Sequence, residues 1–409
     1  MISLFHDTSA LGIKPDDIGG CPVGCLGIPE FGTDFVIQMV VDTKPNTISD
    51  LIRISGLSHG TDVWLNNAQE LIRSGKATIS TAICTRDDIM TYLINKGMDS
   101  EESFTIMERV RKGTVAKGKC KEWPEFKKDM AEHNVPDWYV WSCEQIKYMF
   151  PKAHAAAYVM MAYRIAYCKI NYPLAYYGAY FGIRADAFSY EIMCQGKEKL
   201  QYYIDDYNRR SATLSKKEQD TMKDMKIVQE MYARGFEFEP LDIYKAQATK
   251  FLIVNGKLMP PLSSIDGMGE KAAEAVAEAS KDGTYLSLDD FRQRTKASKT
   301  VIDTMVDLGI LADLPASNQL SLFDFRREIT DGRIKQSQIT YWCHEIIRSQ
   351  AEAGGCYIDA TMGKGNDTLF LCELAGENGK VLAFDIQQEA LDATRRITKG
   401  HTEKSNRRN

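Results

Sequence analysis

The stretch Phe150-Pro-Lys-Ala-His-Ala-Ala-Ala-Tyr158 leads into a long apolar segment of this chain. The pattern predicts a helix over residues 153–170 that ends before the Asn-Tyr-Pro sequence at residues 171–173. Its three consecutive alanines are small enough to let the helix lie close to a ligand or to another backbone. Tyr158 follows His154 by one helical turn and shares its face. These two side chains either contact a ligand or belong to a tightly packed core.

The composition is that of a soluble globular protein of two to four domains. Its 409 residues are 44% hydrophobic and 26% charged. No run of about 18 apolar residues occurs and the first six residues lack the features of a secretion signal, so we expect a cytoplasmic chain without a membrane partner. The ten cysteines indicate buried, reduced thiols. Cys21 and Cys25 have no second pair at zinc-ligand spacing, so we expect no metal site.

The order of the expected elements predicts a mainly α fold with small β elements, followed by a C-terminal partial α/β Rossmann-like unit. Residues 250–258 predict a hairpin that turns at Asn255-Gly256. After residue 325 the pattern changes to a helix over residues 338–350 and then to strand, glycine loop, helix and strand. Residues 47–50 indicate a helix start, and Gly75, Gly97 and Gly113 fall where helices should stop. The other expected helices cover residues 35–41, 48–54, 62–73, 86–96, 101–112, 174–181 and 200–235, the last with a break at 214–217.

Basic residues are concentrated in one part of a chain whose net charge is −5. Between residues 109 and 128 only Glu122 and Glu125 are acidic. Such a run either binds an anion or forms a solvated helix face. The basic residues of this run are Arg109, Arg111, Lys112, Lys117, Lys119, Lys121, Lys127 and Lys128.

Two further blocks, Gly27-Ile-Pro-Glu-Phe-Gly-Thr33 and Ile54-Ser-Gly-Leu-Ser-His-Gly-Thr-Asp-Val-Trp64, are unusually specific. Arg86-Asp-Asp-Ile-Met90 and Met107-Glu-Arg-Val-Arg-Lys-Gly113 follow them in the chain. Together with residues 150–158, these blocks resemble, in the same order, the fingers of PolC-type bacterial replicative DNA polymerases. The resemblance covers about residues 2–325 and implies a fingers domain over residues 1–195.

The resemblance implies that the fingers bind the incoming deoxynucleoside triphosphate (dNTP). Guanidinium and ammonium groups suit a triphosphate, and Arg109, Arg111 and Lys112 lie at a helix end, where cations also complement the helix dipole. His59 alternatively is a turn residue satisfied by backbone groups, in a loop expected at residues 55–61. The residues that the resemblance assigns to dNTP binding are Arg109, Arg111, Lys112, Lys152, His154, Tyr158, Ser58 and His59.

Two-metal nucleotidyl transfer needs closely paired carboxylates for Mg²⁺. We interpret Asp16-Asp17 and Asp87-Asp88 as acidic residues at helix starts or on the surface. The resemblance places the catalytic aspartates and Mg²⁺ in a palm domain upstream of the fingers. We therefore expect no catalytic residue in this chain and no DNA synthesis by this nucleotidyltransferase segment alone.

The sequence Ile265-Asp-Gly-Met-Gly-Glu-Lys271 predicts a glycine hairpin between two helices. Gly267 and Gly269 allow close backbone approach, amides at the start of the second helix suit a phosphate, and Lys271 adds charge. The sequence resembles a helix-hairpin-helix that grips template-primer DNA, within an expected duplex-binding region at residues 196–314. A plain helical hairpin is the alternative.

The peptide at residues 319–323 follows a Pro-Ala-Ser-Asn segment that does not easily continue a helix. Gln319 offers a polar group, whereas Leu320, Leu322 and Phe323 offer apolar anchors for a partner's groove. The peptide, within residues 315–325, resembles the sliding-clamp-binding peptide of PolC-type polymerases. A short amphipathic strand or turn is the alternative.

The C-terminal residues follow a different pattern after an expected linker at residues 326–337. Tyr357-Ile-Asp-Ala-Thr-Met-Gly-Lys-Gly-Asn-Asp-Thr368 and Val381-Leu-Ala-Phe-Asp-Ile-Gln387 resemble the start of a class I S-adenosylmethionine (SAM)-dependent RNA methylase, with Lys364 in place of the usual Asn. The resemblance implies a truncated unit over residues 338–409 with a basic tail. A single dinucleotide-type βαβ unit is the alternative. The SAM-binding residues implied are Asp359, Gly363, Gly365 and Asp385.

The leading hypothesis is a C-terminal piece of a PolC-type DNA polymerase III alpha subunit joined to this incomplete methyltransferase start. A non-catalytic DNA-binding and clamp-tethering adaptor and an RNA methyltransferase with a helical extension are the alternatives. The sequence leaves open whether the junction at residues 326–333 is a genuine fusion, a read-through or an assembly error.

Overall fold

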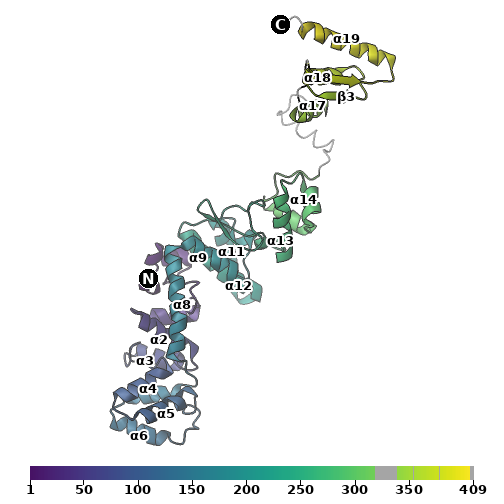
Figure 1. The fold of residues 1–409 in the computed structure, drawn as a ribbon. Coiled ribbons are helices and arrows are strands. Elements are labelled where there is room, and N and C mark those ends of the chain that lie inside the picture. The colour runs from purple at the N-terminus through teal and green to yellow at the C-terminus, as the bar shows by residue number, and fades with distance from the viewer. Residues whose placement is uncertain (318–338, 353, 377, 406–409) are drawn as a thin grey trace. The chain divides into compact units, whose positions relative to one another are not determined.

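A computed structural model describes residues 1–317, 339–352, 354–376 and 378–405 (Figure 1). The chain divides into two compact units, Met1–Asn318 and Gln319–Asn409. The mainly helical architecture with small sheets confirms that part of the expected fold class. The predicted clamp-binding peptide at residues 319–323 and the predicted linker at residues 326–337 lie outside the described residues.

The helices of the N-terminal part start and stop at the expected signals. Thr47 begins α2 with a capping box, in which its hydroxyl accepts from the Asp50 amide and the Asp50 carboxylate accepts from the Thr47 amide. Gly75, Gly97 and Gly113 adopt positive φ just after helix ends. The elements are η1 (Ile2–Phe5), η2 (Ser9–Leu11), η3 (Pro15–Ile18), α1 (Asp34–Thr43), α2 (Ile48–His59), η4 (Trp64–Ala68), α3 (Gln69–Arg73), α4 (Arg86–Asn95), α5 (Ser100–Arg111), α6 (Trp123–Glu132) and α7 (Asp137–Gln145).

The predicted continuous helix over residues 62–73 is wrong in its first half. Leu65 is extended (φ −65°, ψ 138°) and Asn66 is left-handed (φ 56°), so a kink precedes α3. The buried Asn67 explains the kink, because its side-chain amide donates to the Asp62 carbonyl and accepts from the Ser142 hydroxyl at 2.6 Å. A tertiary hydrogen bond to a residue 75 positions away thus overrides the local periodicity.

The long helix predicted from the opening stretch is α8 (Lys152–Asn171), and α9 (Pro173–Ile183) follows it. Figure 1 shows α8 running beside α2 and reaching α9. Ala155, Ala162 and Ala166 are fully buried, which lets α8 lie close to its neighbours. The close approach predicted from the small residues is therefore confirmed for Ala155, whereas Ala157 is exposed.

The segment after α9 returns to the same core. The predicted break in the charged segment falls between α11 and α12, where Ser215 caps α12. Lys169 of α8 is fully buried and donates to the carbonyls of Gly24 and Leu26 and to Glu230 of α12. The elements of this segment are α10 (Tyr190–Met193), α11 (Lys197–Arg209), η5 (Ser211–Thr213) and α12 (Lys216–Ala233).

A second, smaller core is formed by buried residues between Leu241 and Leu311 together with Tyr190. The predicted hairpin is confirmed: β1 (Leu252–Val254) pairs antiparallel with β2 (Lys257–Met259), with Val254 opposite Lys257 and the turn at Asn255-Gly256. Its helical elements are η6 (Leu262–Ser264), α13 (Glu270–Ala279), η7 (Ser280–Asp282), α14 (Leu288–Thr295) and α15 (Lys299–Asp307).

The described part of the second unit contains one parallel strand pair. β3 (Cys356–Asp359) aligns with β4 (Lys380–Ala383), with Asp359 opposite Ala383, and α18 (Asn366–Ala375) connects them. α17 (Ile339–Gln350) precedes the pair and α19 (Gln388–Ser405) follows it. Two strands and a crossover helix agree with the expected element order, but they do not show a Rossmann-like domain.

The expectation that the cysteines are buried is only partly correct. All ten are free, and Cys25, Cys84, Cys120 and Cys143 are buried, whereas Cys168, Cys343 and Cys356 are exposed. Burial raises the pKa of the Cys25 and Cys84 thiols to about 12. The Cys25 thiol donates to the Phe31 carbonyl at 3.3 Å, so this cysteine stabilises the turn around residues 25–31.

Candidate functional site

The segment at residues 147–150 joins four of the sequence blocks identified above. The Thr61 amide donates to the Tyr148 carbonyl at 3.0 Å, and the Arg86 amide donates to the Phe150 carbonyl at 3.2 Å. The Met149 amide donates to the carbonyl of Arg111 at 3.2 Å. This segment, which we call the central strap, therefore connects the C-terminal ends of α2 and α5 and the N-terminal end of α4 to the start of α8.

Gly113 shows why the strap approaches α5 so closely. Its φ is +68°, and a Cβ atom on this residue would clash with the Lys147 carbonyl oxygen. Only glycine fits this left-handed position against the strap backbone.

A row of four rings lies along the start of α8. The His59 ring stacks on Phe150 with centroids 5.1 Å apart, Phe150 meets His154 edge-on at 4.7 Å, and His154 meets Tyr158 at 4.7 Å. His154 is exposed and the Tyr158 side chain is 47% exposed. The interpretation of His154 and Tyr158 as core residues is therefore wrong, and their rings are available to a ligand.

Ser58 and His59 belong to the last turn of α2 rather than to a loop, which corrects the expectation for residues 55–61. The capping box at Thr47 and the termination at Gly60 define a full helix. The Ser58 hydroxyl donates to the Ser55 carbonyl at 2.9 Å, and His59 Nδ1 lies 2.9 Å from the same carbonyl oxygen. His59 Nε2 lies 3.3 Å from a carboxylate oxygen of Glu30, in the Gly27–Thr33 block.

Lys152 lies at the start of α8 beside the acids of α4. Its amide donates to Asp87 at 2.7 Å, and its Nζ lies 3.4 Å from Asp88. Asp88 also accepts from the Thr85 amide at 2.8 Å and lies 3.8 Å from Arg53. These contacts agree with the prediction that Asp87 and Asp88 are helix-start acids.

The three cations at the end of α5 separate into two groups. Arg111 and Lys112 share Glu108, with Arg111 Nη2 2.8 Å and Lys112 Nζ 2.8 Å from the same Glu108 oxygen. Arg109 instead contacts Glu122 at 3.0 Å. The Arg111 hydrogen bonds, followed by those of Lys112, lower the pKa of Glu108 to about 2, and Glu108 raises the pKa of Arg111.

Two cations on one carboxylate leave excess positive charge at this helix end. Lys117, Lys119 and Lys121 are exposed, and within the described residues none of them has a carboxylate oxygen within 4.0 Å. The run between residues 109 and 128 can therefore attract an anion, although five of its eight basic residues already have ion-pair partners.

The glycine hairpin is followed by an α-helix but is not preceded by one. Gly267 has φ +83°, Gly269 is the N-cap of α13, and Lys271 is exposed in the first turn. The element before the hairpin is the 3₁₀ turn η6 rather than an α-helix. The amides at the start of α13 nevertheless have the arrangement expected for a phosphate contact.

The predicted SAM-binding residues lie around the β3–α18 connection. The Gly363 amide donates to Asp385 at 2.9 Å, and Asp359 is buried and accepts from the Thr368 hydroxyl at 2.5 Å. A Cβ atom on Gly365 would lie 2.7 Å from Thr394 Oγ1, so Gly365 allows α19 to pack closely. Backbone hydrogen bonds from Gln387 and Gly363 lower the pKa of Asp385.

The carboxylates near the strap do not fit a Mg²⁺ site. Asp87, Asp88 and Glu108 are occupied by backbone amides and cations. Among the described side chains, no group of three or more His, Cys, Asp or Glu residues could hold a metal ion.

Residues 2–134 match the bacterial DNA polymerase III alpha subunit finger domain. A helix-hairpin-helix motif matches residues 235–322. The polymerase III PolC-type of Caldanaerobacter subterraneus subsp. tengcongensis is 52% identical over 322 residues, or 79% of this chain and 22% of that protein. Those of Clostridium perfringens (50% over 323 residues) and Bacillus cereus (49% over 323 residues) have the same coverage.

The first 320 residues or so therefore match PolC-type DNA polymerase III, and the chain spans about a fifth of the length of these relatives. The comparisons do not support the methyltransferase resemblance of the C-terminal part. Among the described helices, none combines the length and the apolar character needed to cross a membrane.

Three residues around the central strap were not predicted to have a role. Phe150 joins His59 to His154, although it was part of the quoted stretch. Glu108 precedes Arg111 by three residues and Lys112 by four, a helical spacing that could have identified it. Glu30 approaches His59 from 29 residues away, and no local pattern indicates this contact.

Proposed function

We propose that the first unit forms the part of a PolC-type DNA polymerase that binds the incoming dNTP and the template-primer DNA. The observation that supports this proposal most is the meeting of the matched sequence blocks at the central strap. The aromatic row starts in this segment at Phe150, and the basic end of α5 lies beside the segment, because the Met149 amide donates to the Arg111 carbonyl.

In this proposal the cations bind the triphosphate. Arg109, Arg111, Lys112 and Lys152 would exchange their carboxylate partners for phosphate oxygens, since bidentate guanidinium–phosphate pairs are strong. Tyr158 and His154 would stack beneath the nascent base pair. Ser58 and His59 would support the base-pair side of the site, because the Ser58 hydroxyl contacts the His59 ring and that ring stacks on Phe150.

The remaining assignments extend from the same match. Gly267, Gly269 and Lys271 would hold the duplex backbone without reading sequence, because amides and a lysine contact phosphates. Gln319, Leu320, Leu322 and Phe323 would bind the sliding clamp, and the proposed location is the cytoplasm. Mg²⁺ and the catalytic carboxylates of nucleotidyl transfer would belong to the palm of the polymerase.

Equilibrium binding to a fluorescent primer–template duplex tests the DNA-binding part of the proposal. We expect affinity to fall steeply between about 50 and 200 mM salt, because phosphate contacts release counterions. A chain that shows no duplex binding at low salt would contradict the proposal. Duplex and clamp binding without any dNTP binding would favour the adaptor hypothesis.

For the second unit, SAM binding is the second candidate function. The parallel β3–α18–β4 arrangement and the closure of the glycine loop on Asp385 favour it. Calorimetric titration of the full chain with SAM, compared with Asp385→Ala, tests this candidate. If titration with SAM gives no heat of binding for either protein, SAM binding is eliminated as a function.

A further inference from the structure

The Gly27–Thr33 block folds into a tight turn to which the proposed function assigns no role. The Gly32 amide donates to the Ile28 carbonyl at 2.8 Å, and a Cβ atom on Gly32 would lie only 2.9 Å from that carbonyl oxygen. The Cys25 thiol donates to the Phe31 carbonyl within the same turn. These contacts fix the backbone from several sides, so the turn can hold a residue in an unfavourable conformation.

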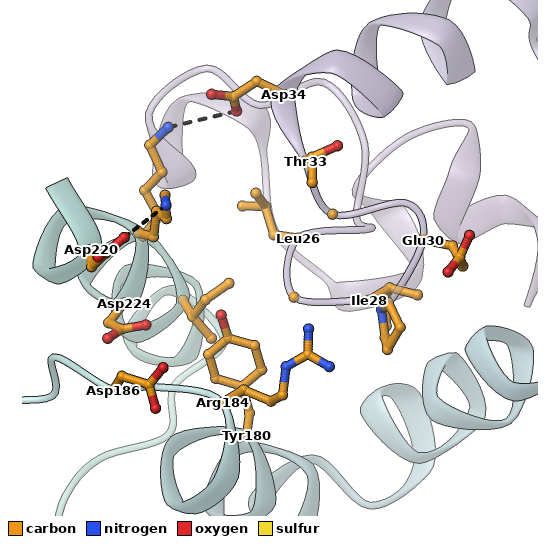
Figure 2. Close-up of a pocket in the computed structure, with 16 residues that line it drawn as sticks. Leu26, Ile28, Glu30, Thr33, Asp34, Tyr180, Arg184, Asp186, Asp220 and Asp224 are labelled. Carbon is orange, nitrogen blue, oxygen red and sulfur yellow. Dashed lines mark hydrogen bonds and ion pairs between the residues drawn. The ribbon is translucent and has the colours of Figure 1, made fainter. Parts of the chain in front are cut away.

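Glu30 is that residue. Its φ is +69°, which is unfavourable for a residue with a Cβ atom. The turn forms one wall of a cavity of about 590 Å³ beside Asp224, and Figure 2 shows Glu30 on the opposite side of the turn from Asp220 and Asp224. The Glu30 side chain is 13% exposed. A largely buried carboxylate therefore lies away from the acidic residues of the cavity.

The Glu30 carboxylate contacts α2. The Ser55 hydroxyl donates to one of its oxygens at 3.3 Å, and His59 Nε2 lies 3.3 Å from the same oxygen. Within the described residues, no lysine or arginine nitrogen lies within 4.0 Å of Glu30. The attraction of this carboxylate is therefore directed at the His59 ring.

The orientation of the His59 ring is determined from both edges. Nδ1 lies 2.9 Å from the Ser55 carbonyl oxygen, while Nε2 faces Glu30. A flip of the ring would lose both contacts, because it exchanges a nitrogen for a carbon at each edge. The same ring stacks on Phe150, which meets His154 edge-on. The orientation of His59 therefore affects the position of the two rings that follow it.

We propose that Glu30 is a positioning residue for nucleotide binding. It acts through His59 and Phe150, and it sets the orientation in which His154 meets the nascent base pair. This inference rests on the proposed function. It assigns a role to the strained turn, which holds the carboxylate against α2.

Histidine NMR of the full chain tests the positioning without any nucleotide. The chain has six histidines, so labelling with ¹³C at histidine Cε1 can follow His59 and His154 individually. Glu30→Ala should move both signals. Glu30→Gly should move them equally and should fold well, because glycine tolerates the positive φ. Glu30→Gln should keep both signals near their wild-type positions, because its amide oxygen still accepts.

Asp129→Ala is the matched control, because Asp129 lies 3.4 Å from His133 Nδ1 at the end of α6. It should move the His133 signal and leave that of His154 unchanged. A His154 signal that stays in place in both Glu30→Ala and Glu30→Gly would overturn the inference. A shift of His154 in Asp129→Ala as large as that in Glu30→Gly would overturn it as well.

Affinity for a fluorescent dNTP separates the two proposals. Glu30→Gly should weaken binding by about three- to tenfold, but it should cause no further loss in the His59→Ala background. An equal further loss in that background would contradict a role exerted through His59. Absence of dNTP binding by the wild-type chain, together with the expected His154 shift, would contradict only the proposed function. Normal dNTP binding with an unmoved His154 signal would contradict only the positioning role.

Discussion

The ammonium group of Lys169 lies 2.8 Å from the carboxylate of Glu230, and both side chains are fully buried. Lys169 also donates to Gly24 at 2.9 Å and to Leu26 at 2.6 Å, and Glu230 accepts from Tyr177 at 2.7 Å. Burial lowers the pKa of Lys169, while Glu230 opposes that shift. The pair joins α8 and α12 to the backbone just before the Gly27–Thr33 block.

Lys169→Met should destabilise the first unit by about 3–5 kcal/mol, because it leaves a buried carboxylate without its cation. Urea-induced unfolding monitored by circular dichroism measures the loss. Lys226→Met is a matched control, since Lys226 is half-exposed and 3.8 Å from its partner. It should change stability by less than about 0.5 kcal/mol. Similar losses in both variants would contradict the assigned role of the buried pair.

Glu108→Gln should increase the affinity for a fluorescent dNTP several-fold, because it frees Arg111 and Lys112 for phosphate. The pKa of Glu108 is about 2, below its usual value of 4.5, so its stabilising contribution is present above about pH 4.5 and is lost as pH falls through about 2. The effect of the substitution should therefore be constant between about pH 6 and 8. Glu132→Gln, which removes the exposed partner of Lys128, is the control. Equal affinities for all three proteins would contradict phosphate binding at Arg111 and Lys112.

Asp224→Asn should raise stability above about pH 7. Burial raises the pKa of Asp224 from 3.8 to about 7, so the native state holds a proton that the unfolded chain has released. The resulting stability is complete below about pH 3.8 and declines as pH rises to about 7. The substitution should remove this decline, on the order of 1–3 kcal/mol, in urea unfolding between about pH 5 and 8. Parallel pH profiles for the wild type and the variant would contradict the assignment.

Lys271→Ala should weaken duplex binding for all sequences alike and reduce the slope of log affinity against log salt by about one. Fluorescence anisotropy with two unrelated duplexes measures both quantities. Lys281→Ala is the control, because Lys281 is another exposed lysine in the same part of the chain, and this substitution should leave the slope unchanged. A loss that depends on sequence would indicate base contacts instead of backbone contacts.

Local signals predicted much of the helical framework. The Thr47–Asp50 capping box and the stop at Gly113 both occur where the sequence indicates them. The kink at residues 65–67 was missed because the apolar pattern continues through it. Its cause, the contact of Asn67 with Ser142, joins residues 75 positions apart.

The candidate site was predicted less completely than the framework. Composition and spacing identified the cations and rings, but they did not indicate that Arg111 and Arg109 bind different carboxylates. Contacts such as His59 with Glu30 depend on tertiary packing and leave no local pattern. The cavity beside Asp224 likewise forms only when α9 and α12 meet the Gly27–Thr33 block.

Steady-state kinetics of a chimera test the central claim most directly. In the intact Caldanaerobacter polymerase, residues 2–325 of this chain would replace the matching segment. We predict template-dependent synthesis, with KM for dNTP raised at least about tenfold by Arg111→Ala and by His154→Ala, because each loses a triphosphate or base-pair contact. Lys128→Ala should leave KM unchanged. A chimera that synthesises DNA with the same KM and turnover in all four forms would contradict the assignment of the nucleotide site.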